Sequence, residues 1–265
     1  MSASRVITGI VLVPILLIIV WLLPYQYFMG LVAVATVVGL HEFYRMAEAR
    51  GVRPLSKLGM ALGALLIILD LYGTKRFDWG PAFYITFCVI TVLTARLFSS
   101  RQVEGALSDV AVTLAGLFYV ALLLGFQVAI HRGYQGKYWL VFLYLVIWAS
   151  DTGAYYIGTA FGKHRLYEKI SPKKSIEGLI GGLLASVIIA LLCKQWLVPS
   201  LGIIEAAVLG VVLALVGTIG DLVESLLKRS VGVKDSGTII RGHGGILDRM
   251  DSMMFAAPVL YYYLQ

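Results

Sequence analysis

The sequence of 265 residues predicts an all-α polytopic membrane protein with about nine transmembrane helices and a cytoplasmic N-terminus. Hydrophobic residues make up 59% of the chain and charged residues only 14%, whereas a soluble domain is roughly half apolar and about a quarter charged. The chain therefore lacks the charged side chains that a soluble core of this size needs as a shell. This composition excludes a disordered chain, a collagen and an ordinary soluble enzyme.

Nine continuous apolar segments, each bounded by charged residues, Gly or Pro, predict the helices. A span takes about 20 apolar residues, and the last segment, with 15, is a candidate for a partial or tilted span. Unbroken apolar runs favour helices over barrel strands, in which apolar and polar residues alternate. The first segment is interpreted as a retained span, because no small-residue cleavage site follows it. The segments run approximately over 6–24, 27–44, 57–73, 80–98, 106–130, 138–160, 178–198, 201–224 and 251–265.

The distribution of basic residues predicts the orientation of the chain. Cytoplasmic loops of membrane proteins are enriched in Lys and Arg, which also accounts for the net charge of +7 without nucleic-acid binding. The two cysteines, Cys88 and Cys193, lie in apolar segments and predict no disulfide. With nine spans and a cytoplasmic N-terminus, the only basic residues of the 22 that fall outside are Lys75, Arg76, Arg132, Lys137 and Lys194.

We expect two regions, a scaffold of transmembrane helices over 1–135 and a catalytic region of helices and cytoplasmic loops over 136–265. Carboxylates inside a membrane are costly and are candidates for function. Of the 15 acidic residues, nine lie from Asp151 onward, several of them inside or beside apolar segments. The chemistry is therefore expected in the second region.

A first group of polar residues ends the segment 201–224. Asp221, Glu224, Ser225 and Lys228 share one helix face by their spacing. A helix end that snorkels into the headgroups would explain Lys228 and the neighbouring Arg229. It explains Asp221 poorly, because this carboxylate lies more than one turn deeper.

A second group surrounds the glycine run Gly242–Gly245, which includes His243. Glycines let the backbone approach a ligand and point N–H groups at anions. The run leads into a helix opened by Asp248 and Asp251, and a helix N-terminus favours anions. Helix capping alone would explain only one of these two carboxylates, and the pattern is not that of a Walker A loop. The charged residues nearby are Lys234, Asp235, Arg241 and Arg249.

A third group begins at Asp151, which shares a helix face with Tyr155, Gly158 and Gly162. The glycines predict close helix packing, and Asp151, in the middle of an apolar segment, needs a partner. Further along, the residues from Ser171 to Lys174 predict a basic turn before a helix whose first turn holds Glu177. By itself this turn is also typical of a site for anionic lipid headgroups.

Two polar residues, His41 and Glu42, lie near the end of the second segment. We interpret them as a pair that makes hydrogen bonds between packed helices. Elsewhere, carboxylates near the membrane plane suit Mg²⁺, and basic residues with a glycine turn suit phosphates. The pattern thus indicates Mg²⁺ on nucleotide phosphates beside a lipid headgroup. A zinc site is not indicated, because neither cysteine lies near a histidine in the sequence.

The stretch from Ser225 to Asp251 resembles the signature of the phosphatidate cytidylyltransferase (CDP-diacylglycerol synthase) family. The matching positions are Ser225, Leu227, Lys228, Arg229, Lys234, Asp235, Gly237, Ile240, His243, Gly244, Gly245, Ile246, Asp248, Arg249, Met250 and Asp251. The segments Asp151–Tyr155 and Ser171–Gly178 resemble the same family, so the likeness covers about 150–255. Arg241 departs from the pattern, because the family usually has Pro or Gly there.

This resemblance implies that CTP and phosphatidate react to CDP-diacylglycerol and pyrophosphate in phospholipid biosynthesis. The lipid phosphate, with a second pKa of ~6, is already ionised near neutral pH, so no strong general base is expected. Metal ions and basic groups would neutralise the two polyanions and hold them in line. We expect Mg²⁺, with a second ion such as K⁺ as a further candidate, and the bacterial inner membrane with the active site facing the cytoplasm. The resemblance also implies a homodimer, formed through the first region.

The hypothesis assigns Asp221 and Asp248 as metal ligands, with Asp251 and Glu224 as additional ligands. Lys228, Arg229 and Arg249 would offset phosphate charge, and Asp221, Asp248, Lys228 and Arg229 form the catalytic set. Whether the basic residues 171–174 meet the lipid phosphate or the triphosphate stays open. The substrate-binding candidates are Asp151, Ser171, Lys173, Lys174, Glu177, Ser225, Lys234, Asp235, His243, Gly244, Gly245 and Arg249.

Two other functions remain as alternatives. A CTP-dependent lipid (polyprenol) kinase would release CDP and would need a base for a neutral hydroxyl. An ion-coupled transporter would use Asp151 and Asp221 as ion sites, although the sequence has no visible inverted repeat. A lipid-binding scaffold would leave the acidic residues unexplained.

Overall fold

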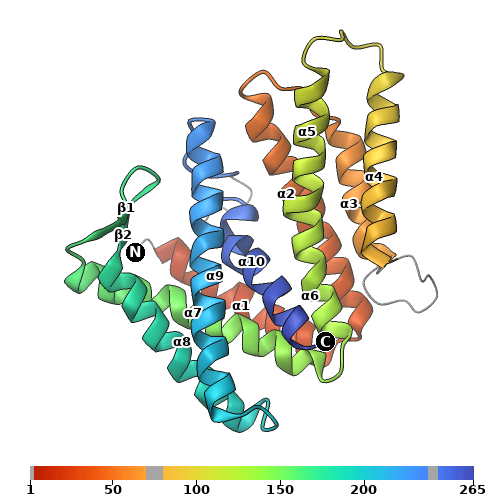
Figure 1. The fold of residues 1–265 in the computed structure, drawn as a ribbon. Coiled ribbons are helices and arrows are strands. Elements are labelled where there is room, and N and C mark those ends of the chain that lie inside the picture. Colours follow the sequence, from red (N-terminus) through yellow and green to blue (C-terminus); the bar gives the residue numbers. More distant parts are fainter. Residues whose placement is uncertain (1–2, 70–79, 238–243) are drawn as a thin grey trace. The chain divides into compact units, whose positions relative to one another are not determined.

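The computed structural model describes residues 3–69, 80–237 and 244–265, and helices dominate it (Figure 1). These residues form two compact units. Unit 1 comprises Met1–Arg132 and Ser230–Arg249, and unit 2 comprises Gly133–Arg229 and Met250–Gln265. The elements in chain order are α1 (Ala3–Leu22), α2 (Tyr25–Glu48), α3 (Ser56–Ile68), α4 (Gly80–Leu97), α5 (Ala106–Gly116), η1 (Leu117–Leu122), α6 (Leu123–Arg132), α7 (Gly136–Phe161), β1 (Arg165–Tyr167), β2 (Ser171–Ser175), α8 (Ile176–Trp196), α9 (Ile203–Ser230) and α10 (Leu247–Tyr263).

Each predicted apolar segment overlaps a helix, and 106–130 coincides with the continuous run α5–η1–α6. Residues 70–73 of the predicted segment 57–73 lie outside the described residues. Within the described residues, five helices are long and apolar enough to cross a membrane: α2, the run Ala106–Arg132, α7, α8 and α9. Shorter apolar helices cover Val13–Leu22, Ser56–Ile68 and Ala82–Leu97. The chain is therefore a helical membrane protein.

Unit 1 packs around Tyr44, a side chain on α2 with no exposed surface. Its hydroxyl donates to the carbonyl oxygen of Thr113 on α5 at 2.9 Å. A Cβ at Gly116 would lie 2.5 Å from the Tyr44 ring, and a Cβ at Gly59 on α3 would overlap the Tyr44 hydroxyl. These two glycines therefore let α3 and α5 close on the ring. The π-helical segment η1, which begins directly after Gly116, was not predicted.

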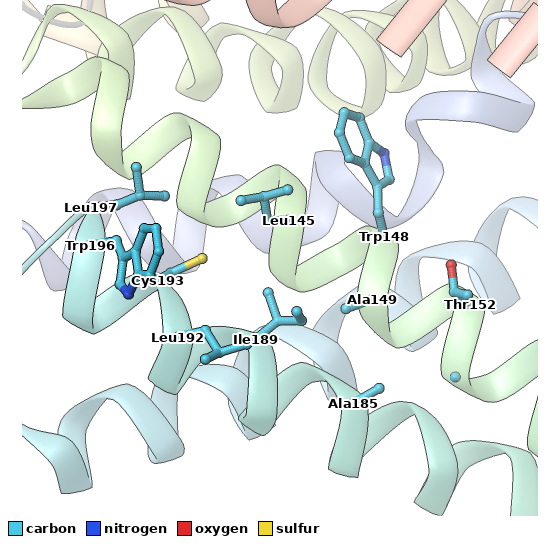
Figure 2. Close-up of a pocket in the computed structure, with 11 residues that line it drawn as sticks. Leu145, Trp148, Ala149, Thr152, Ala185, Ile189, Leu192, Cys193, Trp196 and Leu197 are labelled. Atoms are coloured by element: carbon cyan, nitrogen blue, oxygen red, sulfur yellow. The ribbon is translucent and has the colours of Figure 1, made fainter. Parts of the chain in front are cut away.

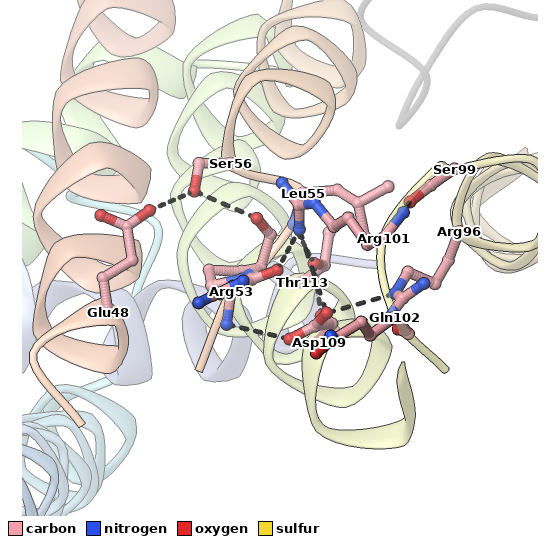
Figure 3. Close-up of polar contacts among 11 residues, drawn as sticks. Glu48, Arg53, Leu55, Ser56, Arg96, Ser99, Arg101, Gln102, Asp109 and Thr113 are labelled. Carbon is pink, nitrogen blue, oxygen red and sulfur yellow. Dashed lines mark hydrogen bonds and ion pairs between the residues drawn. The ribbon is translucent and has the colours of Figure 1, made fainter. Parts of the chain in front are cut away.

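A buried polar cluster joins the loops of unit 1 around Asp109 on α5 (Figure 3). Asp109 accepts hydrogen bonds from Arg96 Nε on α4 at 3.2 Å and from the backbone N–H of Arg53 at 2.9 Å. A guanidinium nitrogen of Arg101 lies farther away, at 3.9 Å. Buried charges are tolerated when they are paired and hydrogen-bonded, and this carboxylate ties the α2–α3 connection to α4 and α5.

In unit 2, α7 and α8 pack side by side, as Figure 1 shows. A Cβ at Gly153 would lie 2.7 Å from the carbonyl oxygen of Gly181, and a Cβ at Gly178 would lie 2.9 Å from that of Ala154. The backbones therefore meet where only glycine fits. The predicted close packing through the glycines of 151–162 is confirmed.

The segment between these helices corrects the all-α prediction locally. Ser171–Ser175 is a strand, β2, paired antiparallel with β1, and not a turn. The two-stranded hairpin gives Pro172 an edge position, where its missing N–H is tolerated. Ser175 then caps α8, because its Oγ accepts from the Gly178 N–H at 3.1 Å. Glu177 lies in the first helical turn, as predicted.

Candidate active site

A cavity of about 690 Å³, called the polar pocket below, opens in unit 2 between α7, the hairpin, α8 and α9. Three of the predicted site residues, Asp151, Lys174 and Asp221, line it from three different elements. The neighbouring Lys173 lines it as well. The polar pocket thus brings carboxylates and basic side chains to one wall, as the sequence predicted for this region.

One ion pair joins two residues that line the polar pocket. Lys174 Nζ lies 2.6 Å from Asp221 Oδ2, and the two side chains are 25% and 33% exposed. Asp221 also receives a long hydrogen bond of 3.4 Å from the hydroxyl of Ser225, one turn further along α9. Solvent can therefore reach this pair, and so can a ligand of either charge.

The remaining polar face of α9 is turned into the protein. Glu224 has no exposed surface and forms an ion pair with Lys228. Ser225 and Lys228 are buried too, so the alternative explanation of Lys228 as a snorkelling side chain does not hold, whereas its role toward phosphate stays a prediction. Arg229 is exposed, and its Nε donates to the carbonyl oxygen of Ile170 at 3.5 Å. Lys228 thus neutralises a buried carboxylate one turn from Asp221.

Asp251 adds a further carboxylate from α10. It lies close enough to Asp221, Glu224 and Asp151 for the negative charges to repel one another. A Cβ at Gly220 would lie 2.6 Å from the Asp251 carbonyl oxygen, so α9 and α10 approach closely here. Carboxylate oxygens from three helices within electrostatic range of one another are the donor set that Mg²⁺ prefers.

Carboxylates are the ligands that a hard cation prefers, but the described residues do not form a coordination shell. Across the described ranges, no three His, Cys, Asp or Glu side chains converge closely enough to hold a metal ion. Lys174 and Lys228 instead lie against Asp221 and Glu224. A divalent cation would therefore replace an ammonium group as the neighbour of Asp221.

The other predicted carboxylate, Asp248, lies in unit 1. Its Oδ2 accepts hydrogen bonds from the Ser236 N–H at 3.0 Å, the Ser236 hydroxyl at 2.9 Å and the Gly245 N–H at 2.7 Å. The neighbouring amides of Ile246 and Leu247, at the start of α10, donate to Glu42. The backbone amides of Gly245, Ile246 and Leu247 thus bind carboxylates of the chain itself, and phosphate binding by this loop stays a prediction.

The other predicted residues have these positions. Glu177 accepts from the backbone N–H groups of Lys163 and His164, and its Oε1 lies 2.6 Å from His164 Nδ1. Gly244 has a φ of 83°, which glycine adopts without strain. Ser171 is half-buried, whereas Lys173, Lys234, Asp235 and Arg249 are exposed. His243 and Arg241 lie outside the described residues.

A second cavity of unit 2, also of about 690 Å³, is called the apolar groove below (Figure 2). It runs along α7 and α8, and Gly153 and Ala185, which lie at the close approach of the two helices, are part of its lining. Leu145 and Trp148 line it from α7, and Ile189 and Leu192 line it from α8. Both helices are long and apolar enough to cross a membrane.

Two residues with contacts at these sites were missed by the sequence reasoning. Arg165 lines the polar pocket from β1, and its signal was a basic run between two apolar segments. Glu42 accepts a hydrogen bond from the Leu247 N–H at the start of α10, as expected for a contact between helices, and further ones from Ser236 and Ile246 outside the helices. The signal for Glu42 was its carboxylate inside an apolar segment, the criterion that selected Asp151 and Asp221.

Comparison with known proteins identifies the family of this chain. The model of the cytidylyltransferase family matches residues 3–265. The chain is 33% identical over 266 residues to a phosphatidate cytidylyltransferase of Synechocystis sp., with 90% of this chain and 88% of the relative covered. Proteins of the same name from Staphylococcus epidermidis (37% over 207 residues; 75% and 76% covered) and Staphylococcus aureus (38% over 205 residues; 76% and 75%) also match. The chain therefore belongs to the cytidylyltransferase family of transferases, which confirms the resemblance.

Proposed function

We propose that this chain is a phosphatidate cytidylyltransferase, which converts CTP and phosphatidate to CDP-diacylglycerol and pyrophosphate. The observation that carries the proposal is the polar pocket, where Arg165, Lys173 and Lys174 line the same cavity as Asp151 and Asp221. Such a wall suits a reaction between two polyanions, because basic groups bind phosphates and carboxylates bind the accompanying cation. The names of the relatives support the same reaction.

The reaction requires neutralisation of the negative charge on the two substrates more than it requires a general base. An oxygen of the lipid phosphate attacks the α-phosphorus of CTP, a P–O bond forms there, and the bond to the β-phosphate breaks as pyrophosphate leaves. The attacking oxygen is already ionised, because the second pKa of a phosphate monoester is about 6. Lys174, Lys173 and Arg165 then reduce the repulsion between the two substrates and hold them for in-line attack.

Mg²⁺ is the proposed cofactor, with K⁺ as a candidate second ion. When bound, the divalent ion would supply positive charge for the phosphate oxygens of the transition state. Asp221 would hold it, with Asp251 and Glu224 as additional ligands from the same unit. Asp248, in unit 1, stays a predicted ligand on the strength of the family signature. Lys228 keeps Glu224 paired in the buried part of α9.

The lipid substrate also accounts for the apolar groove. We place an acyl chain of phosphatidate there, because its lining is apolar and its walls are helices long enough to span a membrane. The chain would enter sideways from the bilayer. The proposal includes nine spans, a cytoplasmic active site in the bacterial inner membrane, and a homodimer formed through residues 1–135.

The first experiment incubates the purified protein in detergent with Mg²⁺, phosphatidate and CTP labelled in its α-phosphate. We expect label in lipid-extractable CDP-diacylglycerol, lost without divalent metal and in Asp221→Asn. The control is Glu205→Gln, because Glu205 lies at the other end of α9 and binds the Gly202 N–H at 2.9 Å. This variant should keep its activity.

Three outcomes would overturn the proposal. Labelled CDP would indicate a lipid kinase, and substrate flux in proteoliposomes without CTP would indicate a transporter. Absence of turnover across divalent metals with added K⁺ would exclude the activity for this chain.

A further inference from the structure

Glu42 lies on α2 with only 3% of its surface exposed. A carboxylate is costly to bury unless it is ionically paired or hydrogen-bonded. Three donors, all from one segment more than 190 residues away in sequence, approach it: the Ser236 hydroxyl at 3.2 Å, the Ile246 N–H at 3.0 Å and the Leu247 N–H at 3.0 Å. Glu42 thus binds Ser236 and the start of α10 within unit 1.

Two of these donors stand at the N-terminus of α10, which begins at Leu247. The first amides of a helix have no partner within the helix, and a negative charge there is stabilised by the helix dipole. Glu42 supplies that charge from another helix. Hydrogen bonds to an ionised acceptor are also stronger than those to a neutral one, so the start of α10 is fixed against α2.

Ser236 connects Glu42 to Asp248. Its hydroxyl lies 3.2 Å from Glu42 and 2.9 Å from Asp248 Oδ2, and its backbone N–H also donates to Asp248. A hydroxyl carries a single proton, so the two carboxylates share one donor. A shift of Glu42 is therefore transmitted to Asp248 through a single buried side chain.

Gly237 and Gly245 lie so close to Glu42 that neither position has room for a Cβ atom. A Cβ at Gly237 would lie 2.5 Å from Glu42 Oε1, and a Cβ at Gly245 would overlap both Glu42 and Ser236. At neither position does the backbone have a positive φ. Close approach to Glu42, and not backbone conformation, therefore accounts for glycine at 237 and 245.

We infer that Glu42 is a positioning residue, which holds Ser236, Ile246 and Leu247 in the arrangement that fixes Asp248. The inference rests on the proposed function for its effect on turnover. In this arrangement the amides of Gly245, Ile246 and Leu247 bind the chain's own carboxylates. The charge of the substrate phosphates would then be neutralised by basic side chains. Asp248 is then oriented before any substrate binds.

The test compares Glu42→Gln and Glu42→Asp with Glu48→Gln. Glu48 is a matched control, because it lies on the same helix, is exposed and accepts from the Ser56 hydroxyl at 2.8 Å. A neutral amide loses the charge-assisted bonds, so we expect kcat to fall about tenfold or more in Glu42→Gln, with the KM of both substrates nearly unchanged. Ser236→Ala, a milder change, should lower kcat in the same direction.

A double-substitution cycle separates positioning from a general structural role. Gly237→Ala alone should be impaired, because its Cβ would collide with Glu42. Glu42→Asp shortens the carboxylate by one carbon, so Gly237→Ala combined with Glu42→Asp should regain activity relative to Gly237→Ala. Strictly additive losses would contradict the inference.

A readout independent of turnover distinguishes this inference from the proposed function. Limited trypsin digestion should cut after Lys234 faster in Glu42→Gln than in the wild type or in Glu48→Gln, because the segment is released from α2. Equal cleavage rates, or a wild-type kcat in Glu42→Gln, would overturn the inference. If the wild type lacks cytidylyltransfer but the cleavage rates differ as expected, only the proposed function fails.

Discussion

Lys174 Nζ lies 2.6 Å from Asp221 Oδ2, so β2 and α9 meet through an ion pair on the wall of the polar pocket. A phosphate that enters the pocket competes with Asp221 for the ammonium group, and a cation competes with Lys174 for the carboxylate. A phosphate that binds Lys174 therefore frees Asp221 for a cation, and a cation that binds Asp221 frees Lys174 for a phosphate. Such coupling is reciprocal, since each ligand changes the affinity for the other by the same factor.

Lys174→Met tests this coupling. Without substrates, we expect tighter binding of Mn²⁺ than in the wild type, because no ammonium group competes for Asp221. Turnover should fall about tenfold to a hundredfold, the range for loss of one hydrogen bond to a charged group. Mn²⁺ titration followed by electron paramagnetic resonance measures the first effect. Lys169→Met, an exposed change outside the pocket lining, is the control, and weaker Mn²⁺ binding in Lys174→Met would contradict the coupling.

Gly153→Ala should separate α7 from α8. The added Cβ would lie 2.7 Å from the Gly181 carbonyl oxygen, and overpacking of this kind costs about 1–3 kcal/mol. We expect a lower midpoint of thermal unfolding in detergent. Gly30→Ala on α2 is the matched control, because no atom lies within 4 Å of its added Cβ. Equal midpoints for the two variants would show that the helices do not approach as closely as described.

The Asp109 cluster predicts unequal roles for two arginines. Arg96 and Asp109 are both buried and make a hydrogen-bonded pair (Figure 3), so Arg96→Met should reduce the free energy of unfolding by about 3–5 kcal/mol. Arg101 is 42% exposed and 3.9 Å from the same carboxylate, so Arg101→Met should change it by less than about 1 kcal/mol. Denaturant unfolding of both variants measures the difference, and a larger loss for Arg101→Met would reverse the assignment.

The apolar groove predicts a dependence on acyl-chain length. Ile189 lines the groove, and Ile189→Trp should fill part of it. We expect turnover of dipalmitoyl phosphatidate to fall more than that of dioctanoyl phosphatidate, since the longer chain needs more of the groove. Ile188→Trp, at a neighbouring position that is 58% exposed, is the control. The same loss for both lipids would place the acyl chain elsewhere.

The positions of the helices followed from apolar runs alone, because a membrane span needs a long segment that satisfies its own backbone. Asp151, Lys174 and Asp221 were selected by their charge beside such runs, and all three line one cavity. The β1–β2 hairpin was not predicted, since its few residues carry no clear alternation. The burial of Lys228 against Glu224 was not predicted, because helix spacing alone does not distinguish a buried face from a solvated one.

The hydrophobic periodicity of the sequence did not predict the role of Glu42, for a different reason. Its donors at Ile246 and Leu247 are 204 and 205 positions away, and no local pattern connects residues at that separation. The same holds for the two units, each of which combines distant stretches of the sequence. Three-dimensional contacts are needed to show which distant backbone groups such a carboxylate binds.

The distance in sequence between Glu42 and its donors also has a consequence for biogenesis. A ribosome makes α2 long before residues 236–247, so Glu42 is integrated into the membrane without the amides that later bind it. During that interval the carboxylate has none of these donors, and a buried carboxylate without hydrogen bonds is costly. Arrival of the glycine loop then completes unit 1, and a nascent chain stalled before that loop retains an exposed acidic side chain that quality-control proteases can recognise.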